Sequence, residues 1–275
     1  MQQRILSVFL GLTLAASLTT GCAKERIKAE KAAADLLISD EQENQIGLQV
    51  KQELEQKQHV QYVTDPVVVD YVNKVAGPIL QQAARARKGV QWKVSVINDP
   101  KTVNAFATPG GYLYVYTGLL LAADNEAQLA GVLAHEAGHV VGRHSARAMV
   151  DTYGLQAITQ LALGKNPGAA AQIAAQLVGG GAMLAHSRSE ETEADEYGAT
   201  YAAGANYDPH GLITFFTKLQ KMQGNSPEAL KWLSDHPTNT ERIQHLDQYI
   251  AQHGLHGTEL GPERLAPIRQ KLGGK

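Results

Sequence analysis

The chain has 275 residues, of which 44% are hydrophobic, so it can form one substantial core or a domain with small appendages. Lys and Arg total 25 against 27 for Asp and Glu, and this balance excludes the basic excess that draws proteins to nucleic acid. Only 6% of the residues are aromatic while alanine and glycine are abundant, which favours closely packed helices over a large sheet sandwich.

The N-terminal residues have the features of an exported, lipid-anchored protein. The stretch "MQQRILSVFLGLTLAASLTTGC" combines an early positive charge with an uncharged apolar run, which predicts a signal peptide at residues 1–21. Cys22, the only cysteine, ends "LTTGC", which resembles the lipobox of bacterial lipoproteins, although Thr19 stands where leucine is preferred. We expect a periplasmic protein attached to the membrane through lipidated Cys22. In lipoproteins of this kind Ala23 implies the outer membrane.

Two helices are expected after a tether. Residues 22–38 are charged and rich in alanine, as tethers are. Ser39 or Asp40 then caps a helix whose apolar residues recur at helical spacing, namely Ile46, Val50 and Leu54. The stretch "TDP" at residues 64–66 opens the second helix.

The remainder predicts a small sheet followed by helices. The stretches "WKVSVI", "NAFATPG" and "YLYVYTG" alternate or are β-branched, and turn residues separate them, so we expect three short strands. Asp124 or Asn125 caps the next helix, and further helices are expected at about 146–163, 167–203, 209–223 and 239–252. The fold class is α+β: a mainly helical domain at residues 39–255 with a small β-sheet beside the helix that begins after Asn125, and a C-terminal tail at residues 256–275. The apolar stretch from Pro167 is interrupted by Gln172 and Gln176, so we expect a packed helix there and not a membrane span.

The stretch "LAHEAGHVVGRH" contains the pattern H-E-x-x-H. His135 and His139 are four residues apart on a predicted helix, so both imidazoles project from one face and can hold a single ion. Glu136 lies about 100° round the helix from His135, beside the metal, where a base that acts on water belongs.

A third ligand is needed to complete a zinc site. His144 comes one residue too early for the longer pattern H-E-x-x-H-x-x-G-x-x-H and, on a continuous helix, points elsewhere. In "SRSEETEAD", Glu191 and Asp195 share one helix face. Glu191 can therefore bind the ion while Asp195 accepts the outer N–H of a ligand histidine. Glu190 and Glu193 are competitors that lack this pairing, and a solvated acidic face is the alternative for the whole cluster.

The segments "HEAGHVVGRHS", "SRSEETEAD" and "SDHPTNTERI", in this order, resemble the family of zinc metalloendopeptidases that includes the CAAX prenyl proteases, HtpX and BepA. The likeness extends over about residues 40–250 and implies that the domain at residues 39–255 is a metallopeptidase domain. The remaining match is to small soluble or lipid-anchored, LoiP-like bacterial members. It implies one zinc ion per chain, hydrolysis of peptide bonds with Glu136 as the base, and protein or peptide substrates, particularly misassembled envelope proteins. It also implies that His236 lies near the metal, either stabilising the oxyanion or acting as a reversible fourth ligand.

Three further expectations complete the sequence picture. The substrate peptide is expected to pair with an exposed strand formed by Asn104, Ala105, Phe106 and Ala107, although a purely structural edge strand explains the pattern as well. Arg242 is expected to support the loop that carries His236. The remaining histidines have no partner pattern and are expected to be ordinary surface or cap residues, namely His59, His186, His210, His245, His253 and His256. An envelope assembly factor that holds clients in the same groove is the alternative function.

Overall fold

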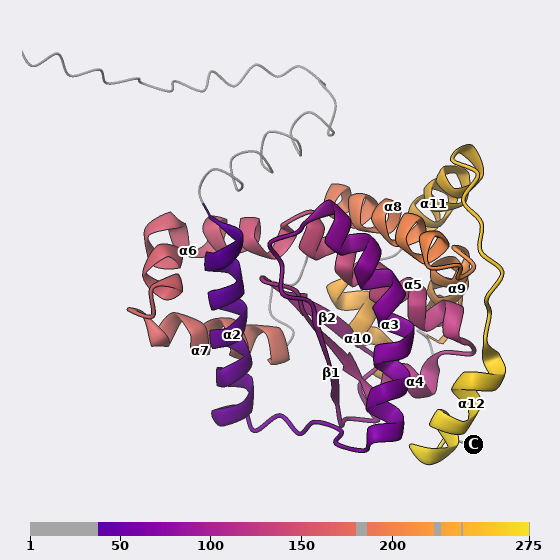
Figure 1. The fold of residues 1–275 in the computed structure, drawn as a ribbon, viewed down its shortest axis with the longest axis horizontal. Coiled ribbons are helices and arrows are strands. Elements are labelled where there is room, and N and C mark those ends of the chain that lie inside the picture. The colour runs from indigo at the N-terminus through magenta and orange to yellow at the C-terminus, as the bar shows by residue number, and fades with distance from the viewer. Residues whose placement is uncertain (1–37, 180–185, 223–226, 238, 275) are drawn as a thin grey trace, which may run out of the picture.

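The computed structural model describes residues 38–179, 186–222, 227–237 and 239–274, and these residues form a mainly helical protein with one small sheet (Figure 1). The predicted α+β class is therefore confirmed. The predicted signal peptide, Cys22 and nearly all of the tether lie outside the described residues. In chain order the elements are α2 Asp40–Gln56, α3 Pro66–Ala86, β1 Lys93–Ile97, β2 Ala105–Thr108, β3 Tyr112–Tyr116, α4 Thr117–Ala122, α5 Glu126–Val141, α6 His144–Ala162, α7 Pro167–Gly179, α8 Arg188–Gly204, α9 Gly211–Met222, α10 Pro227–Asp235, α11 Thr240–Gln252 and α12 Pro262–Lys271.

The sheet has the strand order β1-β3-β2, in which β1 runs parallel and β2 antiparallel to β3. Successive side chains of a strand point to opposite faces. The aliphatic ones, such as Leu113 and Val115, join a core with α3 and α5. The aromatic ones, such as Phe106 and Tyr114, join a second core with α2, α6 and α7. The sheet is thus buried on both faces between two groups of helices (Figure 1), and β2 forms one of its edges.

Several helices begin at the residues that the sequence indicates. The side chains of Ser39, Asp65 and Asn125 accept backbone N–H groups at the starts of α2, α3 and α5. The predicted helix over 167–203 is wrong in one respect, because Ser187 has extended backbone angles and caps a new helix, α8. Its partner in a capping box is Glu190. The helices α4, α10 and α12 were not expected from the sequence.

The helix α5 lies at the centre of the molecule, and all of its residues are buried. It packs against α3, α8 and α9 and against the sheet. Glycines allow the closest approach to α8: a Cβ on Gly138 would lie 2.8 Å from the carbonyl oxygen of Ala194, and one on Gly198 would lie 3.2 Å from Cα of His135. The motif helix and the helix with Glu191 therefore meet almost backbone to backbone.

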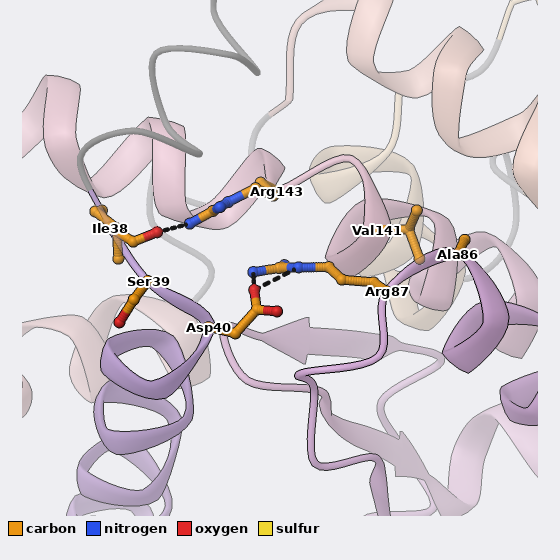
Figure 2. Close-up of a pocket in the computed structure, with 7 residues that line it drawn as sticks. All are labelled: Ile38, Ser39, Asp40, Ala86, Arg87, Val141 and Arg143. Carbon is orange, nitrogen blue, oxygen red and sulfur yellow. Dashed lines mark hydrogen bonds and ion pairs between the residues drawn. The ribbon is translucent and has the colours of Figure 1, made fainter.

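A buried group of charges fastens the start of α2 to the end of α5. Arg87, which follows α3, donates hydrogen bonds to Asp40 and Glu43 of α2 and to the carbonyl of Val140. Arg143 donates to the carbonyl of Ile38 and pairs with Glu43. Both arginines line a cavity of about 350 Å³, and Figure 2 shows their side chains beside Asp40 and Ile38. The two arginines lie with two carboxylates, so charge is balanced within this group.

The C-terminal residues return to the core. Residues 257–259 lie against Asn206 and Tyr207, and α12 follows with Leu265 and Ile268 buried in the core beside α5. Within the described ranges, none of the helices is long and apolar enough to span a membrane.

Candidate metal centre

Four side chains from distant parts of the sequence converge on one buried point. His135 and His139 lie one turn apart on α5, Glu191 lies in the first turn of α8, and His236 follows α10 directly. One ligand atom from each lies within 4.8 Å of those from the others. Each of the four residues is at most 2% exposed. The structure therefore brings together the three residues that the sequence predicts as ligands and the additional histidine that it singles out.

The separations between these atoms match the edges of a coordination tetrahedron. Nε2 of His135 lies 3.0 Å from Nε2 of His139 and 3.2 Å from Nδ1 of His236. Oε1 of Glu191 lies 3.1 Å from Nδ1 of His236 and 3.4 Å from Nε2 of His139. Ligands about 2.1 Å from a tetrahedral zinc ion are about 3.4 Å apart. The four atoms thus have nearly the spacing that one such ion requires.

The outer contact of His135 determines which ring nitrogen faces this point. Its Nδ1 lies 2.9 Å from Oδ1 of Asp195, so Nδ1 carries the proton and the lone pair of Nε2 points inward. Burial lowers the pKa of His135 although Asp195 opposes the shift. Burial and the neighbouring histidines lower the pKa of His139 well below its usual value. Neutral imidazoles beside a buried carboxylate are a donor set that fits a divalent cation.

Glu136 lies next to the four ligand atoms without being one of them. Burial raises the pKa of Glu136 to about 8, even though His236 opposes the shift. Its carboxylate accepts a hydrogen bond from the backbone N–H of Ala107 on β2, and its Oε1 lies 3.3 Å from Nε2 of His236. Glu136 is therefore held between the sheet edge and the metal centre.

His236 is held in place by an aromatic neighbour and by charge. The indole of Trp232 stacks on its ring with centroids 4.2 Å apart, and Trp232 is fully buried. Burial lowers the pKa of His236, but the carboxylates of Glu191 and Glu136 outweigh this and raise it overall. The stacking partner comes from α10, which the sequence did not reveal.

Arg242 does more than the expected support of a loop. It donates to the carbonyl of Pro237, beside His236, and also pairs with both carboxylates of α8, Glu191 and Asp195. Burial raises the pKa of Asp195, but the guanidinium of Arg242 outweighs burial and holds it below its usual value. The first turns of α11 and α8 are joined in this way.

The four residues of the expected substrate strand lie at the sheet edge beside the centre, but all four are at most 3% exposed, so this edge is covered and not exposed as expected. Ala105, Phe106 and Ala107 belong to β2, and Asn104 precedes it. The side chain of Asn104 accepts the N–H of Ala105 and donates to Asp235, the last residue of α10. The edge thus lies close to His236, and the outward N–H groups of Ala105 and Ala107 already have partners.

Two histidines outside the four-residue cluster also approach it. The ring of His186 stacks on His139 with centroids 3.9 Å apart, so its expected role as an ordinary surface residue is wrong. The sequence held one signal of this position. Ser187 and Glu190 form a capping box that starts α8, so His186 directly precedes the helix that carries Glu191. His144 is not on a continuation of α5: Arg143 is left-handed with φ 60°, and the turn returns His144 to the outer side of His139. Glu193 contacts His144 at 3.1 Å.

Comparison with known families agrees with this geometry. The model of peptidase family M48 matches residues 66–250, more than half of the chain. The chain belongs to peptidase family M48, and the resemblance read from the motifs is confirmed. The matched range includes both helices of the centre and His236.

Named relatives show the same relationship. The chain is 34% identical over 182 residues to "Mitochondrial metalloendopeptidase OMA1" of Schizosaccharomyces pombe, covering 66% of this chain and 53% of that protein. It is 30% identical over 190 residues to the "Beta-barrel assembly-enhancing protease" of Escherichia coli K12, covering 66% and 38%. It is 33% identical over 167 residues to "Metalloprotease YcaL" of the same organism, covering 59% and 63%. The chain therefore spans less than two thirds of the length of each of these relatives.

Proposed function

We propose that this protein is a zinc-dependent endopeptidase that binds one zinc ion per chain through His135, His139 and Glu191. The observation that carries the proposal is the convergence of two imidazoles from α5 and a carboxylate from α8 at ligand spacing, with Glu136 beside them. Zinc at this position would activate a water molecule and polarise the carbonyl of the peptide bond.

Glu136 is the proposed general base and acid. Its carboxylate lies beside the four ligand atoms, with Oε1 3.3 Å from Nε2 of His236, which is within reach of a water molecule at the centre, as a group that takes a proton and later returns it must be. It removes a proton from water as the oxygen attacks the carbonyl carbon. It then delivers that proton to the amide nitrogen as the C–N bond breaks.

His236 is proposed to be a reversible fourth ligand that holds the resting enzyme inactive. Its Nδ1 lies within ligand spacing of both His135 and Glu191, which supports this role over oxyanion stabilisation in the closed state. A catalytic zinc site keeps its fourth position for water, so His236 has to leave before cleavage.

The substrate is proposed to add as a strand to the edge of β2. Because the N–H of Ala107 binds Glu136 and not β3, this side of β2 faces the centre. An extended peptide paired there places its backbone beside Glu136. A peptide added to this edge would have to replace the contacts that these N–H groups now make with Asn104 and Glu136.

The proposed clients are unfolded or misassembled proteins of the cell envelope, met in the periplasm by an enzyme that lipidated Cys22 anchors to the outer membrane. The name of the β-barrel assembly-enhancing relative supports this class of client, and "LTTGC" supports the anchor. The closed position of His236 favours one second candidate, an assembly factor that holds clients at the same edge while cleavage is gated.

Zinc content and casein cleavage, measured on the purified protein with and without chelator, test the proposal. We expect one zinc per chain and cleavage that chelator abolishes. Glu136→Gln should keep the zinc and lose cleavage. If cells respond to this variant as to wild type, the assembly-factor role is favoured.

The third ligand is tested separately with two neighbouring carboxylates of α8. Glu191→Ala should strip zinc from the protein. Glu190→Ala is the matched control and should retain zinc, because Glu190 binds the helix start and not the centre. Equal zinc stoichiometry in the two variants would contradict the proposed ligand set.

A further inference from the structure

His139 has an outer partner that differs from the one His135 uses. Its Nδ1, the nitrogen away from the four-residue cluster, lies 2.7 Å from Nδ1 of His144. Nε2 of His144 lies 3.1 Å from Oε2 of Glu193. His144 is fully buried, and the carboxylate that ends this series is itself 3.7 Å from the guanidinium of Arg147. The motif helix is thus linked to α6 and α8 through a second row of polar atoms.

A hydrogen bond between two imidazoles needs one proton, and Glu193 determines where that proton lies. If His144 donated from Nδ1, its neutral ring would present a bare Nε2 to an ionised carboxylate, and two lone pairs would face each other. If Nε2 of His144 donates to Glu193, then Nδ1 of His144 accepts from Nδ1 of His139. Nε2 of His139 is then bare and points into the cluster.

We propose that His144 and Glu193 are positioning residues that fix the tautomer and ring orientation of His139 through an outer hydrogen-bond chain, namely His139, His144 and Glu193. This inference rests on the proposed zinc function. It gives His144 and Glu193, which the sequence offers as alternative zinc ligands, a role outside the coordination sphere. This hydrogen-bond chain is the counterpart of Asp195, which fixes the tautomer and orientation of His135 by direct contact.

His139, His144 and His186 lie close enough together to suggest a second metal ion, but the contact between His139 and His144 favours a hydrogen bond. Two nitrogen ligands of one zinc ion are about 3.4 Å apart, whereas the two Nδ1 atoms are 2.7 Å apart, which is a hydrogen-bond separation. A second ion would also require His139 to bridge two metals. The hydrogen-bond chain needs neither.

The local sequence creates the space that His144 occupies. Arg143 adopts a left-handed conformation at φ 60°, so the chain reverses immediately after α5. A Cβ on Gly142 would lie 2.3 Å from Nε2 of His144. Gly142 itself has ordinary helical angles, φ −69° and ψ −11°, so alanine is tolerated by the backbone and affects only the imidazole.

Zinc affinity, measured by competition with a chromophoric chelator, tests the proposal. Removing an outer partner of a metal ligand typically weakens metal affinity about 10- to 100-fold. We expect His144→Leu to weaken zinc binding by about that factor and Glu193→Ala to weaken it less, because His144 keeps its ring. His144→Asn offers an oxygen near the position of Nδ1 and should restore most of the affinity. Gly142→Ala should weaken binding as well.

The tautomers provide a readout that needs no variant. Long-range ¹⁵N–¹H spectra of the zinc-loaded wild-type protein should show the proton of His139 on Nδ1 and that of His144 on Nε2. A proton on Nδ1 of His144 would overturn the proposal. So would wild-type zinc affinity in folded His144→Leu protein. Wild-type protein that binds no zinc would instead contradict the proposed function.

Discussion

Arg242 contacts two carboxylates that have different tasks. Its side chain lies between Glu191, a proposed ligand, and Asp195, the partner of His135. All three residues are at most 7% exposed, so their charges cannot be solvated by water. Without the guanidinium, the two carboxylates would lie one turn apart on the same face of α8 with only histidines for compensation.

We expect Arg242→Ala to lower the free energy of unfolding of the metal-free protein by about 3–5 kcal/mol, because the variant leaves buried charges unpaired. Urea titration followed by circular dichroism measures this change. Lys57→Ala is the control, since Lys57 pairs with Glu53 on the surface and such exposed pairs contribute little. Equal midpoints for the two variants would contradict the role given to Arg242.

At the scale of secondary structure, the metal centre depends on how closely two helices approach. Gly138 lies inside the H-E-x-x-H motif and faces α8, whose first turn carries Glu191. A methyl group there would lie 2.8 Å from the carbonyl oxygen of Ala194. That contact involves backbone, which cannot rotate away.

Gly138→Ala should therefore cost about 1–3 kcal/mol of stability through overpacking and should weaken zinc binding, since α8 moves away with Glu191. Thermal unfolding and zinc titration measure the two effects. Gly168→Ala in α7 is the matched control. The nearest atom to its added methyl group would be 3.6 Å away, so we expect unchanged or slightly higher stability. A stable, zinc-tight Gly138→Ala protein would show that the helices need not touch here.

The elements that could be read from the sequence are those whose signals are local. Ser39, Asp65 and Asn125 cap helices with their own side chains. The alternating residue pattern of each strand can likewise be recognised within a few consecutive positions. The proposed ligand residues could be predicted because residues four positions apart share one helix face. The turn at Arg143 could not be predicted, because a left-handed arginine has no sequence signature and is stabilised by Glu43 from a distant helix. The approach of His144 to His139 was hidden for that reason.

The scale of the whole molecule adds segments that cover the centre from outside. The helix α10 brings Trp232 onto His236, and its last residue, Asp235, reaches Asn104 at the sheet edge. The contact between Asp235 and Asn104 joins residues 131 positions apart, so it follows from tertiary packing, which single-sequence patterns do not encode. Trp232 and His236 are instead four residues apart, and the N–H of His236 donates to the carbonyl of Trp232, so their stacking is a contact along one helical turn that residue spacing indicates once α10 is recognised.

The C-terminal segment poses the remaining question at this scale, namely whether residues 256–275 are a tail or part of the folded unit. Leu265 of α12 is fully buried beside α5, and Arg264 pairs with Glu126 in the first turn of that helix. If this packing contributes to the unit that holds the metal centre, Leu265→Ala should lower the free energy of unfolding by about 2–5 kcal/mol, as other buried leucines do. Leu260→Ala is the matched control from the same segment. Its side chain is 47% exposed, so the change should stay within about 0.5 kcal/mol.

A chain lacking residues 256–275 should unfold at a still lower urea concentration and lose zinc, because the start of α5 loses its partners. Unfolding curves for Leu265→Ala and for the shortened chain that coincide with that of the wild type would instead mean that the segment is a tail and that the core is complete without it.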